Sequence, residues 1–142
     1  MTLIVLLILI DQITKIFATR LLERIVVIEG LLSFDYVENR GAVFGLMQGS
    51  NYIMAALSAI ICVVLIIYLA RLIKDGKTPS IGFYMVIAGG VGNIIDRIFR
   101  GYVVDFIDTP FIATFNVADM LVVIGACFII LSQLKEIMKD GK

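Results

Sequence analysis

No charged residue interrupts YIMAALSAIICVVLIIYLA, the run from Tyr52 to Ala70. A helix that crosses the hydrocarbon core of a bilayer needs about 20 predominantly apolar residues, so this run predicts a transmembrane helix. The whole chain agrees, since 61% of its 142 residues are apolar, 17% are charged and the mean hydropathy is +1.04. Soluble domains are about 45–50% apolar and about 25% charged, and a small domain has too little interior to hide such an excess. Lipid is therefore the expected solvent of this chain.

Three other stretches are apolar over a similar length, although each contains ionisable residues. Membrane β-barrels show many alternating segments of about 10 residues, whereas these runs are continuous. We therefore expect a single all-α polytopic membrane domain over residues 1–142, with four transmembrane helices. The expected spans are about 1–22, 52–70, 81–99 and 116–134, and the expected extracytoplasmic segments are about 23–51 and 100–115.

Basic residues predict how these spans are oriented. Lysine and arginine are enriched in cytoplasmic loops, and here they gather after the second span and in the C-terminal tail: Arg71, Lys74, Lys77, Lys135, Lys139 and Lys142. With four spans, that loop and both termini are expected in the cytoplasm, and the other two connections outside. The first outer connection contains a β-branched-rich stretch, 24–34, which predicts one or two short strands.

The composition excludes several kinds of site. The chain has no histidine, which removes imidazole bases, Ser-His triads and histidine metal sites. Cys62 and Cys127 each lie in an apolar run, and they indicate neither a disulfide framework nor a zinc site. The net charge of +0 gives no basic surface for nucleic acid. No metal and no organic cofactor is implied.

Ionisable side chains at membrane depth cost about 2.5–3.5 kcal/mol each on insertion scales, so each needs a reason. Asp11 and Lys15 are four residues apart, share a helix face and can pair. They form either a structural ion pair or part of a polar site shared with other spans.

The segment 39–45, Asn39-Arg40-Gly41-Ala42-Val43-Phe44-Gly45, precedes the second span. One interpretation is a turn in which glycine supplies a positive φ. The other is a loop in which small residues let the backbone approach a ligand and Asn39 supplies hydrogen bonds.

The third span ends with Gly89-Gly90-Val91-Gly92-Asn93-Ile94-Ile95-Asp96-Arg97. Its small residues favour close helix contact, and its three polar residues share one helical face. Asp96 is expected to be structural, with its neighbour Arg97 as partner. Arg97 is either an interfacial anchor or a group that holds a substrate carbonyl or phosphate.

Two further aspartates, Asp105 and Asp119, flank the start of the fourth span. Asn116 and Asp119 can be explained as a helix N-cap and a first-turn acid. Alternatively, Asp105 and Asp119 are a close pair of carboxyl groups that share a proton near neutral pH. One would then act as base on a water and the other as acid toward a scissile carbonyl.

Taken together, these segments resemble the lipoprotein signal peptidases, the signal peptidase II family. Five motifs carry the resemblance, in the order of the family: Asp11-Gln12-x-Thr14-Lys15, Asn39-x-Gly41-Ala42-x-Phe44-Gly45, Gly92-Asn93-x-x-Asp96-Arg97, Gly101-x-Val103-Val104-Asp105-Phe106 and Phe115-Asn116-x-Ala118-Asp119.

The resemblance implies a membrane aspartyl endopeptidase of the bacterial inner membrane, with a small extracytoplasmic β-rich cradle. It would cut the signal peptide from a prolipoprotein just before a diacylglyceryl-modified cysteine, with Asp105 and Asp119 as the catalytic pair. Arg97 would contact substrate or the peptide antibiotic globomycin. The implied site-lining residues are Asp11, Lys15, Asn39, Asn93, Arg97 and Asn116, and the implied structural residues are Gly41, Gly92 and Asp96.

Two other functions are compatible with charged residues in a membrane protein. A small proton-coupled transporter would use the aspartate, lysine and arginine residues as a proton relay, but would place them near the midplane of the bilayer. A non-catalytic scaffold subunit would use the glycine-rich faces for packing, and would not need two aspartates beside amide and guanidinium donors.

Overall fold

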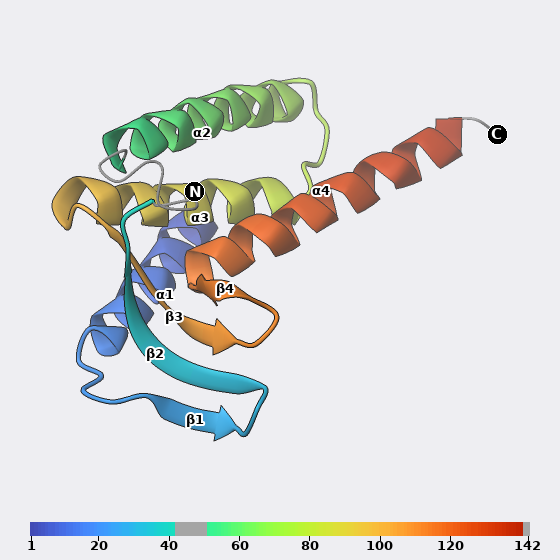
Figure 1. The fold of residues 1–142 in the computed structure, drawn as a ribbon. Helices are drawn as coiled ribbons and strands as arrows, with labels where there is room; N and C mark the ends of the chain where they lie inside the picture. The colour runs from blue at the N-terminus through green and yellow to red at the C-terminus, as the bar shows by residue number, and fades with distance from the viewer. Residues whose placement is uncertain (42–50, 141–142) are drawn as a thin grey trace.

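The computed structural model describes residues 1–41 and 51–140, and within them the chain forms four helices and four strands (Figure 1). Their order is α1 (Thr2–Ala18), β1 (Ile25–Ile28), β2 (Leu32–Asn39), α2 (Asn51–Lys74), α3 (Ile81–Phe99), β3 (Val103–Thr109), β4 (Ile112–Phe115) and α4 (Val117–Asp140). The fold is thus mostly helical with one small antiparallel sheet.

Three of the helices, α2, α3 and α4, are long and apolar enough to cross a membrane. The first helix, α1, has 17 residues and carries two buried charged side chains, Asp11 and Lys15. Large apolar side chains along α2, such as Ile60 and Val64, are exposed on the surface of the molecule. An apolar surface of this kind is suited to contact with lipid.

Small residues let α3 lie very close to its neighbours. A Cβ placed on Gly89 would collide with the backbone oxygen of Ala118 in α4, and one placed on Gly92 would lie 2.5 Å from Asp11 Oδ2 in α1. The packing role expected for these glycines is therefore confirmed by geometry. Close approach matters because it brings the polar side chains of three helices within hydrogen-bonding distance of one another.

The sheet is a four-stranded antiparallel meander in the order β1-β2-β3-β4. It lies beside the ends of the helices where α3 ends and α4 begins (Figure 1). Ala18 at the end of α1 packs with Val104 and Phe106 of β3, which attaches the sheet to the helices. The sequence predicts strands at 24–34, where β1 and the start of β2 lie, whereas β3 and β4 occupy the segment expected only as a connection between spans.

The turn from α3 into β3 depends on Gly101, whose φ of 78° is in the left-handed region. Glycine adopts this conformation without steric cost and is common just after the end of a helix. The reversal aims β3 back along the end of the bundle, so that Asp105 faces the start of α4.

A candidate active site where the helices meet the sheet

The Asp105 carboxylate is held by two side-chain amides from different elements. Asn39 Nδ2, at the end of β2, donates to Asp105 Oδ2 at 2.8 Å, and Asn116 Nδ2, just before α4, donates to Asp105 Oδ1 at 2.6 Å. Asp105 is only 1% exposed. The two donors satisfy its buried oxygens and fix the direction of the carboxyl group.

Asp119 lies in the first turn of α4 and forms a reciprocal capping box with Asn116. Asn116 Oδ1 accepts from the backbone N–H of Asp119 at 2.9 Å, and Asp119 Oδ2 accepts from the backbone N–H of Asn116 at 3.3 Å. Such an exchange satisfies two helix N-terminal donors. Asn93 Nδ2 from α3 also donates to Asp119 Oδ1 at 2.8 Å. The helix cap expected from the sequence is therefore present, and its acid, Asp119, is also a member of the expected pair of carboxyl groups.

A second polar cluster lies behind this pair and centres on Lys15, which is completely buried. Lys15 Nζ contacts Asp11 Oδ2 at 3.0 Å, Asp96 Oδ2 at 2.9 Å and Asn93 Oδ1 at 2.9 Å. Asp11 Oδ1 in turn accepts from the backbone N–H of Ala118, at the start of α4, at 2.9 Å. The expected pairing of Asp11 and Lys15 is present, and it forms part of a larger network.

Asp96 connects α1, α3 and β3. Its Oδ2 accepts from Lys15 and, at 3.1 Å, from the backbone N–H of Val104, while its Oδ1 accepts from Arg100 Nη1 at 3.1 Å. We expected Arg97 as its partner, and that expectation is wrong: within the described residues, the ion pairs of Asp96 go to Lys15 and Arg100. Successive helical residues point in different directions, whereas residues four apart lie on one face.

Arg97 lies within electrostatic range of the two aspartates of the pair. Its charge interacts with Asp119, Asp105 and Asp96, in decreasing order. Its Nε is buried and has no hydrogen-bond partner in the part of the chain that the structure describes. Arg97 can therefore act electrostatically on the region around the two carboxyl groups.

Burial and charge both act on the ionisation of Asp105. The pKa of Asp105 is raised to about 6: desolvation and the neighbouring charge of Asp119 raise it, while the Asn39 and Asn116 hydrogen bonds and the Lys15 charge oppose the rise. A buried carboxyl group next to a second carboxylate favours its neutral form. Asp105 can therefore hold a proton under mildly acidic to near-neutral conditions.

The loop motif at 39–45 is described only through Gly41. Asn39 Oδ1 accepts from the backbone N–H of Gly41 at 3.0 Å, and Gly41 has a φ of 75°. The turn with a positive φ is thus present at Gly41. Ala42, Val43, Phe44 and Gly45, the remainder of the motif, lie outside the described residues.

An apolar cavity of about 350 Å³ opens beside Asp119. Apart from Asp119, its lining side chains are all apolar, and they come from β4 and one face of α4: Ile112, Phe115, Met120, Val123 and Ile124. A carboxylate at the edge of an apolar cavity can meet the polar part of a ligand whose remainder is apolar.

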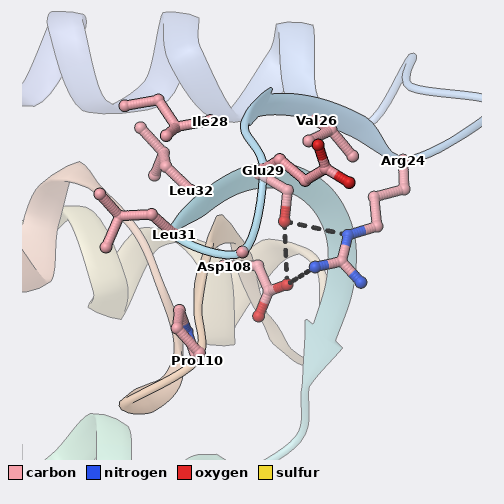
Figure 2. A pocket seen from close by; sticks show the side chains of 10 residues that line it. Arg24, Val26, Ile28, Glu29, Leu31, Leu32, Asp108 and Pro110 are labelled. Atoms are coloured by element: carbon pink, nitrogen blue, oxygen red, sulfur yellow. Dashed lines mark hydrogen bonds and ion pairs between the residues drawn. The ribbon is translucent and has the colours of Figure 1, made fainter.

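A different pocket, of about 180 Å³, lies at the tip of the sheet (Figure 2). Arg24 bridges β-strands there, with Nη2 2.7 Å from Asp108 Oδ2 and Nε donating to Ser33 Oγ at 3.0 Å. Ser33 Oγ also donates to Asp108 Oδ2 at 3.0 Å. Arg24 is 57% exposed, and an ion pair this accessible contributes little to stability. Arg24, just before β1, thus contacts Ser33 of β2 and Asp108 of β3, and neither Asp105 nor Asp119 lines this pocket.

Three contributors to the site were given no role from the sequence, although two of them, Gln12 and Ala118, stand in the quoted motifs. Gln12 Nε2 contacts Asp11, Asp96 and the backbone oxygen of Gly92, at 3.1 to 3.3 Å. Arg100 and the backbone N–H of Ala118 complete the network. The four-residue spacing of Asp96 and Arg100 is the signal that could have identified Arg100.

The described residues contain no group of three or more histidine, cysteine, aspartate or glutamate side chains that could hold a metal ion. The candidate site combines two carboxyl groups of different exposure, Asp105 and Asp119, with three asparagine amides that fix their directions. The guanidinium of Arg97 lies within electrostatic range of both. This arrangement can activate a water and protonate a carbonyl oxygen at the same time.

Comparison with known proteins gives a consistent family. Residues 3–135 match the family model described as "Signal peptidase (SPase) II". The chain is 36% identical to a protein named lipoprotein signal peptidase from Clostridium novyi, over 91% of this chain and 93% of that one. It is 41% identical to one of the same name from Caldanaerobacter subterraneus subsp. tengcongensis, over 92% and 90% of the two chains.

Solved structures resemble this fold closely. One bacterial membrane enzyme superposes with a TM-score of 0.82 at 33% identity, covering 94% of this chain and 91% of that one. A second gives 0.81 at 30% identity, covering 95% and 87%. Together with three helices suited to crossing a bilayer, these neighbours indicate a multi-pass membrane protein.

Proposed function

The chain belongs to the signal peptidase II family, and we propose that it removes signal peptides from prolipoproteins as an aspartyl endopeptidase. One observation carries the aspartyl assignment: Asp105 and Asp119 are each held by side-chain amides and are joined through the single side chain of Asn116. Membership of the family indicates the reaction, which is removal of a signal peptide. The two aspartates can act as its acid and base without a histidine. A proton-coupled transporter finds no support in the relatives.

Hydrolysis by such a pair requires one ionised carboxylate and one protonated carboxyl group together. The carboxylate takes a proton from water as the water oxygen attacks the scissile carbonyl carbon, while the carboxyl group gives its proton to the carbonyl oxygen. Two close carboxyl groups resist double ionisation, and the raised pKa of Asp105 supports the half-protonated state. Asn39, Asn93 and Asn116 would orient the two groups.

The proposed substrate carries a diacylglyceryl group on a cysteine, and cleavage occurs on the amino side of that cysteine. The apolar cavity beside Asp119 supports binding of an apolar part of this substrate next to the reacting bond. Membrane lipid would surround its acyl chains. Arg97 is suited to hold a carbonyl oxygen of the bound peptide, and globomycin-type peptides would occupy the same place.

We place the site near the outer surface of the cytoplasmic membrane. The basic loop after α2 and the basic C-terminal tail favour the cytoplasm, so α3 would run outward and α4 inward. The 17 residues of α1 rise about 26 Å at 1.5 Å per residue, close to the roughly 30 Å hydrocarbon core. This supports α1 as a fourth span of one domain, with both termini cytoplasmic. Hydrolysis needs water, which the bilayer midplane would not provide.

The function is tested with purified protein and a lipidated prolipoprotein in detergent, followed by the mobility shift on a gel. We expect release of the signal peptide from the lipidated substrate. The matched control is the same precursor without the diacylglyceryl group, which we expect to remain uncut. Equal cleavage of both would contradict the proposed specificity, and no cleavage of either would contradict the proposed function.

A further inference from the structure

The ammonium group of Lys15 has three acceptors for its three N–H bonds. They are a carboxylate oxygen of Asp11, a carboxylate oxygen of Asp96 and the side-chain oxygen of Asn93, all within 3.0 Å. Arg100 adds a second cation on Asp96, so two anions and two cations balance in this buried cluster. A buried charge is tolerated when it is paired and fully hydrogen-bonded, and Lys15 meets both conditions.

Lys15 decides which way the Asn93 amide points. Lysine can only donate hydrogen bonds, so the atom of Asn93 that faces it must be the oxygen. The NH2 group of Asn93 is then on the opposite side, where it donates to Asp119 Oδ1 at 2.8 Å. A second donor, Asn116 Nδ2, also faces Asn93 Oδ1, at 3.3 Å, and requires the same orientation.

We propose that Lys15 is a positioning residue, an inference that rests on the proposed function. Through Asn93, Lys15 directs an N–H donor at Asp119, and this donor makes Asp119 the ionised base. Asp105 then carries the shared proton. The Asn93 amide is the only side chain that contacts both Lys15 and Asp119 among the residues described.

The surroundings of the two aspartates differ in the same sense. Asp119 lies in the first turn of α4, where the helix dipole favours negative charge, whereas Asp105 is buried on a strand. The charged groups around them are Lys15 and Asp11 from α1 and Asp96 and Arg97 from α3. The charge of Lys15 is balanced within its own cluster by Asp11, Asp96 and Arg100, so its influence on Asp119 passes mainly through the direction of the Asn93 amide.

The assignment gives a balanced reaction. Asp119 takes a proton from water, the water oxygen bonds to the carbonyl carbon, and the carbonyl oxygen takes the proton of Asp105. Asp119 then gives its proton to the amide nitrogen as the C–N bond breaks. The new carboxyl group returns a proton to Asp105, which restores the dyad.

The test is the pH profile of kcat/KM for cleavage of a lipidated prolipoprotein. The Asn93→Asp variant is isosteric and keeps an acceptor for Lys15, but it replaces the N–H that faces Asp119 with an oxygen. We expect the ascending acid limb of the profile to move to higher pH by about one unit, because the donor that favours ionised Asp119 is gone. Asn93→Ala should move it in the same direction by less. Lys15→Met is avoided, because it leaves Asp11 and Asp96 buried without their cation.

The matched control is Gln12→Glu, which makes the same amide-to-acid change in the same cluster, against Asp11 and Asp96 rather than Asp119. It should lower stability and leave the acid limb in place. Activity that falls equally at every pH in Asn93→Asp would overturn the proposal, as would an equal shift in Gln12→Glu. Wild-type protein that cleaves nothing would instead contradict the proposed function, so the two failures are distinguishable.

Discussion

Asn116 donates its side-chain N–H to Asp105 at 2.6 Å, and the oxygen of the same amide caps the helix that carries Asp119. One side chain therefore sets the position of both carboxyl groups relative to each other. The start of α4 and the geometry of the proposed dyad cannot change independently.

The two roles of Asn116 can be separated by substitution. Asn116→Ser keeps a cap acceptor but loses the donor to Asp105, whereas Asn116→Ala loses both. We expect activity to fall by about tenfold or more in each, and Asn116→Ala to lose about 1 kcal/mol more of the free energy of unfolding. Cleavage rates and thermal unfolding in detergent measure the two effects. Wild-type activity in Asn116→Ser would show that the bond to Asp105 is not needed.

The close contact between α3 and α1 predicts the effect of a single methyl group. In Gly92→Ala the new Cβ would lie 2.5 Å from the Asp11 carboxylate, so α1 must move and the Lys15 network must open. We expect a loss of about 1–3 kcal/mol in stability, together with reduced cleavage.

Gly90→Ala is the matched control, because its new Cβ meets only the Cys62 thiol, at 2.5 Å. The double variant Gly90→Ala, Cys62→Ala should restore stability, whereas Cys62→Ala should not rescue Gly92→Ala. The measurement is thermal unfolding of the two glycine variants, each with and without Cys62→Ala. A Gly92→Ala protein as stable as the wild type would contradict the observed packing.

The polar network explains which features could be predicted from the sequence. The Asp11–Lys15 pair follows from four-residue spacing within one helix, and the apolar runs identify the long helices. Asp96 was assigned the wrong cation: its partner Lys15 depends on how α1 lies against α3, which no local pattern specifies, whereas Arg100 is four residues away on the same helix and could have been predicted. The pairing of β3 with β2 could not be predicted because α2 and α3 separate the two strands in the chain, whereas its pairing with the adjacent β4 is local. The five ordered motifs nevertheless identified the family, which the relatives confirm.

The raised pKa of Asp105 predicts a pH dependence of stability with a definite sign. Its folded pKa of about 6 exceeds the ordinary value of 3.8, so the folded state binds more protons between these values. The contribution of Asp105 to stability is therefore greatest in acid and falls as the pH rises from about 4 to about 6. Thermal unfolding of wild-type protein, measured against Asp105→Asn across this range, isolates the effect. A wild-type advantage that grows with pH would contradict it.

The proposed orientation can be read from chemical labelling in spheroplasts. In a background with Cys62 and Cys127 replaced, a cysteine in place of Glu29, exposed at the β1–β2 turn, should react with an impermeant reagent from outside. A cysteine in place of Lys77, exposed between α2 and α3, should react only after the membrane is opened. Ser33 is unsuitable as the outer position because it is 3% exposed. The reverse labelling pattern would show that the protein has the opposite orientation in the membrane.

The central claim is that Asp105 and Asp119 together carry out the hydrolysis, and it is tested most directly by the single-turnover rate of Asp105→Asn and of Asp119→Asn. The substrate is a lipidated prolipoprotein, and each variant is first shown by thermal unfolding in detergent to be folded. The account predicts that each substitution lowers the rate by about 100-fold or more, because neither carboxyl group can perform the role of the other. A folded variant of either aspartate that cleaves at a rate near that of the wild type would contradict it.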